Sequence, residues 1–546
     1  DKVRREAEEE EEEDEGSTNI SDMALSPVLG SKVKVFSTPF AHQVLNNRVG
    51  SFCSNCLRAP ENGNKLRKCG ACELPWYCSI ECQKNAWSSH RNECRRLKTV
   101  FPNLPLTEVL FMSKVIDRVL FLAEHGDQFG WQKERTFNSL VDHQEDILKD
   151  EAKMAHFEKL HGKMTTFRGS EMVDRQFFFQ VFCKTSINSH SIHTNGGIEI
   201  GMALDLGVSR YNHCCRPSCS MVFDGIRVFL RPLVPTVDVT DTTKATIAYV
   251  DIGRSRYRRR LDLKAKWYFD CFCERCNDTS EDSLTALKCS RDACAGRVAT
   301  REDAPPTPLS CDECQAELSA AEVEAGQTLM RSLPASFDPQ CPISKAENFT
   351  EKEKREQEAS KRLEMILERK GESARNERVE VSEEMQRKMI VYVEVEELLG
   401  SARERLHSTN VYVTRLQTAL FHLAGQLGAA LPAIHHSIYD NYKLCFPKAD
   451  RHVGFSLINI VKSLIEQGKR KKAVWYAYEA MTIFEVCLGL EHPFYLQTLA
   501  LWTYLEKGMP KTDEELISLT GFGDNRPVDL SAILAKASVL DETPLA

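Results

Sequence analysis

The chain contains 546 residues, carries a formal net charge of −8 and has an isoelectric point near 6.1. Its length exceeds what one hydrophobic core usually serves, so we expect three or more structural units. The acidic balance argues against a protein that binds nucleic acid or an anionic membrane through its overall electric field.

The first residues are acidic where a secretory signal would be basic and then apolar. No stretch reaches the roughly 18 uninterrupted apolar residues of a transmembrane helix. We therefore expect an intracellular protein without membrane contact. Residues 1–25 include "EAEEEEEEDE", whose like charges repel one another, and this segment predicts a disordered tail.

Next in the chain come a strand, a cysteine-rich module and a helical region. "KVKVFSTPF" has strand character, and the module at residues 53–94 follows it. Residues 106–190 have the periodicity of amphipathic helices. Within them, "VLFMSKVIDRVLFLAEHG" carries charged residues at helical spacing, which predicts a half-buried helix rather than a membrane span.

A β-rich stretch separates this region from a long helical part. "CSMVFDGIRVFLRPL" predicts a hairpin around Asp224 and Gly225, and "KATIAYVDI" predicts a further strand. From about residue 346 the pattern is helical nearly to the end. "EKEKREQEASKRLEMILERK" is so highly charged that we expect a solvated helix or a linker there.

The segment "FSLINIVKSLIEQGKRKKAVWYAYEAMTIFEVCLG" predicts two consecutive helices and indicates how the C-terminal helices pack. Leu457, Val461 and Leu464 form one face, and Gly468 breaks the helix. Small residues on the second helix allow close packing, as in a tetratricopeptide-type hairpin; a plain helical bundle remains the alternative because no clean 34-residue period is present. This second face consists of Ala473, Ala477, Ala480 and Phe484.

The 21 cysteines cluster, which in a reducing compartment indicates metal sites rather than disulfides. Four thiolates or imidazoles saturate one tetrahedral zinc ion, so a cluster of eight predicts two structural zinc sites without an open position. These eight are Cys53, Cys56, Cys69, Cys72, Cys78, Cys82, His90 and Cys94. The last two are four residues apart and would face the same way on a helix.

Two further clusters follow. Cys271, Cys273 and Cys276 supply three ligands where zinc needs four, and the missing ligand can be Cys215 in "NHCCRP". The other cluster has a complete ligand set and predicts an independent zinc ribbon; its alternative is a flexible loop with incidental thiols. It consists of Cys289, Cys294, Cys311 and Cys314.

Three motifs in order resemble a known family. "NHCCRP" resembles the cofactor-loop signature of SET-domain lysine methyltransferases, and "YVDIGRSRYRRRLDLKAKWYFDCFCERC" resembles the tyrosine strand, helix and post-SET zinc segment of that fold. The order of the first eight ligands resembles a MYND finger. From residue 26 to about 505 the chain is similar to the SET and MYND domain family, in the branch with a tetratricopeptide-like C-terminal domain.

The resemblance implies an α+β fold in six parts. A β-rich SET domain holds an inserted MYND zinc finger, and a post-SET zinc segment, a zinc ribbon and an all-α C-terminal domain follow. The implied boundaries are 1–25 for the acidic tail, 26–50 for the N-terminal SET strands, 51–98 for the MYND finger, 99–256 for the SET core with its helical insertion, 257–345 for the post-SET segment and zinc ribbon, and 346–546 for the helical domain.

The resemblance also implies a function, the transfer of a methyl group from S-adenosylmethionine to lysine in histone tails or other proteins. Asn188, Asn212 and His213 would hold the cofactor, and Phe269 would pack against its adenine. Tyr249 would lie beside the transferred methyl group as both a cofactor-binding and a catalytic residue.

The implied surroundings of this site follow from the same resemblance. Trp267 would line the lysine channel, Cys215 would be a zinc ligand and Cys214 would take the usual serine position. In the finger, alternate pairs would share a metal, giving Cys53, Cys56, Cys78 and Cys82 on one zinc ion and Cys69, Cys72, His90 and Cys94 on the other. Proline-containing peptides would dock on the MYND finger, and a monomer in nucleus and cytoplasm is expected.

The sequence departs from the family pattern at three places. "GSTNI", residues 16–20, stands where the family has a glycine-rich turn; Ser218 replaces an asparagine; and residues 242–245 replace a glycine–glutamate–glutamate–leucine turn. The alternative function is therefore a catalytically weak or inactive adaptor in transcriptional regulation.

A basic run in residues 254–260 raises nucleic-acid binding as a further possibility, against a solvated helix face or a rim for acidic substrates. The run consists of Arg254, Arg256, Arg258, Arg259 and Arg260.

Overall fold

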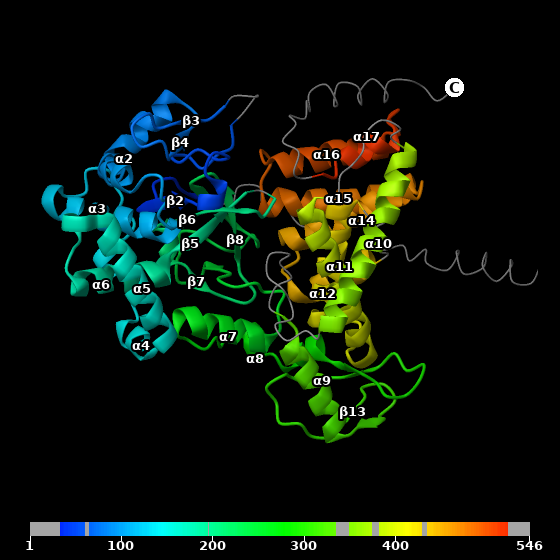
Figure 1. Cartoon of the computed structure of the whole chain (residues 1–546). Coiled ribbons are helices and arrows are strands. Elements are labelled where there is room, and N and C mark those ends of the chain that lie inside the picture. The colour runs from blue at the N-terminus through cyan, green and yellow to red at the C-terminus, as the bar shows by residue number, and fades with distance from the viewer. Residues whose placement is uncertain are drawn as a thin grey trace, which may run out of the picture.

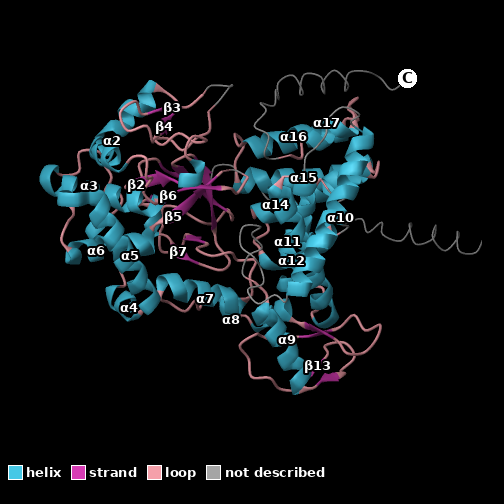
Figure 2. Cartoon of the chain, in the orientation of Figure 1, coloured by secondary structure: helices cyan, strands magenta, loops and turns pink. Residues whose placement is uncertain are grey.

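The computed structural model describes residues 33–60, 65–194, 196–334, 349–373, 382–428 and 434–521. The acidic tail and the "GSTNI" segment lie outside these residues. Strands lie between a helical layer and a larger helical lobe (Figures 1 and 2). Among the described helices, none combines the length and the apolar character needed to cross a lipid bilayer.

The central strands form two antiparallel three-stranded sheets and one short parallel pair. The first sheet has the order β1-β9-β8 and the second has the order β2-β6-β5. β7 pairs with β10 in parallel, so the asparagine–histidine motif lies beside the tyrosine strand. The bounds are β1 Lys34–Phe36, β2 Ala41–Val44, β5 His190–His193, β6 Glu199–Leu204, β7 Asn212–His213, β8 Cys219–Asp224, β9 Arg227–Pro232 and β10 Thr246–Ile247.

The helical layer confirms the prediction for residues 106–190. Side chains of Ser79, Asp150 and Asp174 accept hydrogen bonds from the first turns of α2, α5 and α6, which fixes where these helices begin. The predicted half-buried helix is α3. The bounds are α2 Ile80–Val100, α3 Thr107–His125, α4 Gln144–Lys149, α5 Glu151–Arg168 and α6 Arg175–Asn188. The finger between the first strands and α3 adds β3 Arg67–Lys68 and β4 Trp76–Tyr77.

A buried ion network joins these helices. Arg96 of α2 and Arg168 of α5 both donate to Asp117 of α3, at 2.7 to 2.9 Å. Ser113 Oγ accepts from the same two guanidinium groups at 3.0 and 2.8 Å. Glu171 also accepts from Arg96 Nε at 2.8 Å, so two carboxylates balance the two arginines. Because these charges are paired inside the protein, the helix of the finger is fixed to the helical layer.

The predicted hairpin is confirmed by β8 and β9, with Asp224 opposite Arg227. Gly225 has φ +60, and a Cβ built on it would lie 2.0 Å from the carbonyl oxygen of Cys56. That carbonyl accepts a hydrogen bond from Ile226 N–H at 3.1 Å. The hairpin turn therefore lies directly against the finger, and only glycine allows this approach.

We expect Gly225→Ala to destabilise the protein by about 3 kcal/mol, because it adds a left-handed strain and a contact with backbone. Chemical denaturation followed by fluorescence would measure the loss. The matched control is Gly400→Ala in α11, where a Cβ meets nothing within 4 Å and a small gain of about 0.5 to 1 kcal/mol is expected. Equal stability of both variants would contradict the proposed close contact.

The tyrosine strand is shorter than predicted, since β10 covers only two residues of "KATIAYVDI". Beyond it the chain forms α7 and α8 and then the ribbon, a pair of two-stranded antiparallel sheets that ends at α9. The bounds are α7 Arg256–Trp267, α8 Glu274–Asn277, β11 Leu287–Lys288, β12 Arg297–Val298, β13 Leu309–Ser310, β14 Glu317–Leu318 and α9 Ala320–Ser332.

The basic run at the start of α7 is not a solvated helix face. Arg259 is fully buried and donates to Glu281 at 2.7 Å, because a buried guanidinium needs a carboxylate partner. Arg254 pairs with Asp262 at 2.6 Å, and Arg256 pairs with Asp282 at 3.0 Å. Most arginines of the run therefore form ion pairs with carboxylates of the same chain.

The helical C-terminal region is confirmed, whereas its tetratricopeptide character stays a prediction. The charged segment 351–370 lies in α10, but it is not fully solvated: Ala359 and Leu363 are buried together with Met389 and Val393 of α11. The bounds are α10 Phe349–Ser373, α11 Glu383–Arg405, α12 Val411–Leu427, α13 His435–Cys445, α14 Arg451–Glu466, α15 Arg470–Cys487, α16 Pro493–Glu506 and α17 Asp513–Ser518.

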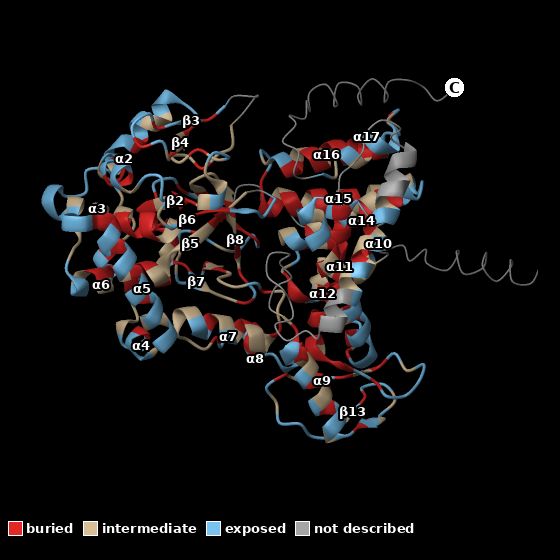
Figure 3. Cartoon of the chain, viewed as in Figure 1, coloured by how far each residue is buried: buried red, intermediate tan, exposed pale blue. Residues whose placement is uncertain are grey.

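The predicted helical pair is α14 and α15. All seven residues of its two predicted faces are buried, and Gly468 between the helices has φ +72. The buried stripes of both helices are visible as red segments in the lobe of Figure 3. Arg231 of β9 donates to the carbonyl of Val486 in α15 at 3.3 Å, so this helical pair also contacts the central strands.

Candidate functional site

Four groups of thiol and imidazole side chains lie close enough to bind metal. Within each group, the candidate ligand atoms are all within 4.8 Å of one another. Tetrahedral zinc with Zn–S bonds of about 2.3 Å requires sulfur atoms about 3.8 Å apart. The groups are Cys53, Cys56, Cys78 and Cys82; Cys69, Cys72, His90 and Cys94; Cys215, Cys271, Cys273 and Cys276; and Cys289, Cys294, Cys311 and Cys314.

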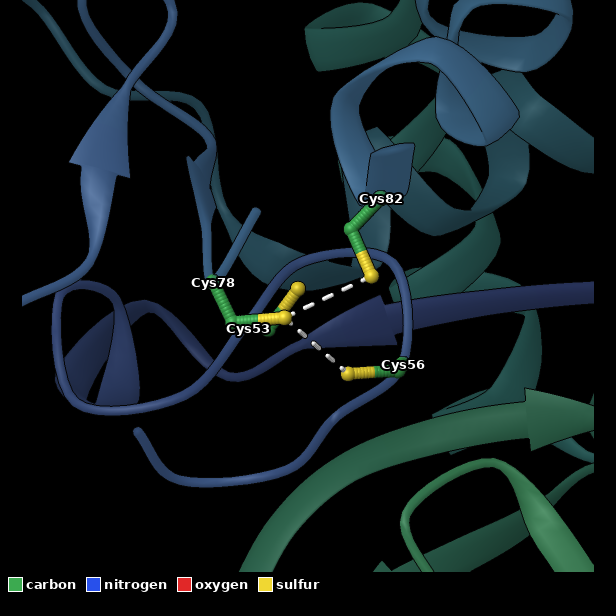
Figure 4. Close-up of side chains that lie close together, drawn as sticks. All are labelled: Cys53, Cys56, Cys78 and Cys82. Carbon is green, nitrogen blue, oxygen red and sulfur yellow. Dashed lines mark hydrogen bonds between the residues drawn. The ribbon is translucent and has the colours of Figure 1, made fainter. Parts of the chain in front are cut away.

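The individual distances agree with that requirement. Figure 4 shows the first group, in which Cys78 Sγ lies 3.8 Å from Cys56 Sγ and 3.4 Å from Cys82 Sγ. In the ribbon, Cys289 and Cys314 are 3.5 Å apart at their sulfur atoms. Each group has four thiol or imidazole ligands and no carboxylate, which fits a closed structural zinc site.

The second group shows how the finger orients its histidine. His90 Nδ1 lies 2.8 Å from a carboxylate oxygen of Glu93, whereas Nε2 lies 3.5 Å from Cys72 Sγ. A carboxylate that accepts from one ring nitrogen leaves the other free to bind metal. The spacing of His90 and Cys94 on α2 thus places both ligands at one site, as the sequence suggested.

The third group connects two distant segments. Cys215 follows β7 and its sulfur lies 3.5 Å from that of Cys276 in α8. Arg275 donates to the carbonyls of Cys215 and Ile252 at 3.0 and 2.8 Å. Arg259 Nη2 lies 3.9 Å from Cys276 Sγ, so a buried cation offsets the negative charge of the thiolates.

A cavity of about 860 Å³ lies beside this group. It is lined by residues from the strands, from α6 and α7, and from the helical lobe. All six residues predicted for cofactor, catalysis and lysine channel are among them: Asn188, Asn212, His213, Tyr249, Trp267 and Phe269. Residues separated by 81 positions in sequence therefore face one space.

His213 links the zinc-type cluster to the tyrosine strand. Tyr249 N–H donates to His213 Nδ1 at 3.0 Å, so the ring proton is on Nε2, which lies 3.2 Å from Cys215 Sγ. Burial lowers the pKa of His213 to about 4, which keeps the ring neutral near pH 7. The backbone of Tyr249 is thereby held in register with the cysteine cluster.

The side chains around Tyr249 are also fixed. Its hydroxyl donates to the carbonyl of Tyr211 at 2.5 Å, and burial raises its pKa to about 12, so it stays protonated. The ring of Trp267 lies 4.9 Å from that of Tyr249, and Trp267 Nε1 donates to Ile187 at 2.9 Å. Two rings thus form one aromatic wall of the cavity.

The remaining predicted residues lie at the rim of this arrangement. Asn188 ends α6, and its amide donates to the carbonyls of Val141 and Lys184, both at 2.7 Å. The ring of Phe269 lies 6.4 Å from that of His213. Asn212 is exposed. An amide oxygen, an exposed polar side chain and an aromatic face could all contact a nucleoside.

Comparisons with known proteins agree with these observations. The MYND finger family model matches residues 53–94. The chain is 29% identical to human (Homo sapiens) histone-lysine N-methyltransferase SMYD3 over 269 residues and 30% identical to the mouse (Mus musculus) protein of that name over 267. The chain is thus similar to histone-lysine methyltransferases and carries a MYND finger. It is also 27% identical over 296 residues to histone-lysine N-methyltransferase ASHR1 of Arabidopsis thaliana.

The matches to these relatives are partial. They cover 48% of it and 59% of the human and mouse proteins, and 51% of it and 58% of the plant protein. The chain therefore spans less than two thirds of the curated relatives' length.

Two of the three departures from the family pattern have local replacements. Ser218 and Thr246 exchange hydrogen bonds: Ser218 N–H donates to Thr246 Oγ1 at 3.1 Å, and Thr246 N–H donates to Ser218 Oγ at 3.0 Å. In the turn before β10, Asp241 accepts from Thr243 N–H at 3.0 Å. These contacts hold β10 in place without the usual residues.

The cavity also contains residues that the sequence did not indicate. Arg135 comes from the segment before α4, Lys266 from α7, and Phe446, Asp450, Arg451 and His452 from the start of α14 and the loop before it. No local motif marks them. The last four reach the cavity only because the helical lobe packs on the strands.

Proposed function

We propose that the chain is a protein-lysine N-methyltransferase that transfers a methyl group from S-adenosylmethionine to lysine in histone tails or other proteins. The observation that carries the proposal is the cavity in which the six predicted residues meet. The names of the partial relatives support the same activity.

Methyl transfer to an amine is an in-line displacement, so alignment matters more than a strong base. S-adenosylmethionine, when bound, supplies the methyl group on a sulfonium. In this chain Asn188, Asn212 and the backbone held by His213 would bind it, and the face of Phe269 would pack on its adenine. None of these residues would have to gain or lose a proton for the cofactor to bind.

Tyr249 and Trp267 would prepare the acceptor. A free lysine has a pKa of about 10.4 and is therefore charged near pH 7. The two aromatic rings remove water from the ammonium group and lower its pKa, so its proton can leave to water. Tyr249 stays protonated, and its hydroxyl oxygen, held by the bond to Tyr211, can accept weak C–H contacts that fix the methyl group.

We further propose that the chain binds four zinc ions, two in the finger, one at the Cys215 cluster and one in the ribbon. The sulfur separations support this number. Proline-containing peptides are proposed to dock on the MYND finger, and a monomer is proposed to act in nucleus and cytoplasm.

Calorimetric titration with S-adenosylmethionine, followed by methylation of a peptide array with labelled cofactor, would test the activity. We expect cofactor binding and label on lysine peptides. Absence of heat at millimolar cofactor, with zinc content intact, would refute the enzyme and favour the adaptor. In that case the hydrogen bonds at Ser218 and Asp241 would preserve the scaffold without cofactor binding.

A further inference from the structure

The charges that line the cavity are unequal. Four cationic side chains, Arg135, Arg210, Lys266 and Arg451, face two carboxylates, Asp251 and Asp450. This excess contrasts with the net charge of −8 for the whole chain. A cavity with positive walls attracts anionic groups.

Both carboxylates are already used by neighbouring groups. Asp450 caps α14 by accepting from the backbone N–H of His452 at 2.8 Å, and its carboxylate lies 2.7 Å from Nδ1 of the His452 ring. Asp251 accepts from Gly253 N–H at 2.9 Å and lies 3.6 Å from Arg254. Both carboxylates are thus engaged by neighbouring groups, and Asp450 also interacts electrostatically with the adjacent Arg451.

The four cations differ in whether a carboxylate lies within ion-pair distance. Arg210 pairs with Glu134 at 3.3 Å. By contrast, Arg135, Lys266 and Arg451 have no carboxylate within 4.0 Å among the residues that the structure describes, and all three are half-buried. Partly buried cations that donate only to carbonyl or hydroxyl oxygens keep their charge available to a ligand.

Two of these cations serve different ends of the cavity. Arg135 acts electrostatically on Tyr249, where the methyl group would be transferred. Arg451 lies on the wall formed by the helical lobe, where it donates to the carbonyl of Met221 at 3.2 Å and acts on His193. A peptide entering between the strands and the helical lobe would pass Arg451.

We propose that Arg451 recognises a glutamate or aspartate side chain of the substrate, so that the preferred acceptor lysine has acidic neighbours. That the bound lysine is a methyl acceptor rests on the proposed function. The recognition of acidic side chains by Arg451 does not depend on it. It favours acidic segments of non-histone proteins over the strongly basic tails of histones.

Binding of fluorescent peptides, measured by anisotropy at low and high salt, would test the proposal without catalysis. The peptides carry one central lysine flanked by glutamates, by glutamines or by lysines. We expect the glutamate peptide to bind roughly tenfold more tightly than the lysine peptide, with a difference that salt reduces. Equal binding, or tighter binding of the lysine peptide, would overturn the proposal.

Charge reversal provides the second arm. Arg451→Glu should invert the preference, and Arg451→Gln should abolish it while retaining a donor for Met221. The matched control is Arg403→Glu on the exposed face of α11, which should keep the native preference. Thermal unfolding of each variant would show that the fold is intact.

Two further measurements distinguish acidic-peptide recognition from cofactor binding by Arg451 and from failure of the proposed enzymatic function. If Arg451→Gln weakens binding of S-adenosylmethionine and leaves peptide preference unchanged, the cation holds the cofactor's carboxylate and the proposal is wrong. If the glutamate preference depends on Arg451 but no peptide is methylated, acidic recognition stands and the enzymatic function fails.

Discussion

Cys215→Ser is expected to lower the zinc content of the purified chain from four ions to three and to lower its melting temperature. The serine hydroxyl is a poor zinc ligand, and the remaining three thiols cannot close a tetrahedral site. Binding of structural zinc is coupled to folding, so losing it removes stability on the order of several kcal/mol. Metal analysis and calorimetric unfolding would measure both effects.

The effect should reach the cavity as well. His213 bonds through one ring nitrogen to Cys215 and through the other to the backbone of Tyr249. Removing the sulfur frees this ring, so we expect cofactor binding to weaken at least tenfold. Cofactor titration of the same preparation would measure this loss.

Cys214→Ser is the matched control for this variant. The neighbouring thiol is half-buried but does not belong to the group of four. We expect it to retain four zinc ions and most of its stability. Full zinc content in Cys215→Ser, or equal losses in both variants, would show that the two segments are not joined by a shared metal.

The candidate site could be predicted because its residues lie in short motifs. Cysteine spacing identified the clusters, and counting showed that the three thiols near residue 271 needed one more ligand. The resemblance to the SET and MYND pattern indicated Cys215 as that ligand and divided the eight ligands of the finger between two sites. The hairpin at Gly225 and the helical pair at Gly468 were predictable because glycine and apolar periodicity are local signals.

Other features depend on packing between distant segments. The basic run was expected to be solvated, yet Arg259 is buried because Glu281, 22 residues later, folds back onto it. α10 was expected to be solvated, yet its apolar residues Ala359 and Leu363 pack on α11. Arg451 reaches the cavity only because the helical lobe lies against β8. No local pattern encodes these contacts.

Tyr249→Phe is expected to reduce methyl transfer by roughly 100-fold while the protein remains folded. The substitution removes only the hydroxyl that bonds to the carbonyl of Tyr211, a loss of about 1 kcal/mol in stability. Without this bond the ring can shift against Trp267, and small errors of alignment cost large factors in an in-line displacement. Initial rates with labelled cofactor and thermal unfolding would separate the two effects.

Tyr439→Phe in the helical lobe is the matched control, since its hydroxyl also makes one hydrogen bond, to Glu479 at 2.9 Å. It should lose a similar amount of stability and keep its turnover. The pKa of Tyr249, raised to about 12 by burial, further predicts that native turnover shows no fall from ionisation of this tyrosine between pH 7 and 10. If Tyr249→Phe keeps full turnover, or if both variants lose turnover equally, the hydroxyl has no special part in aligning the methyl group.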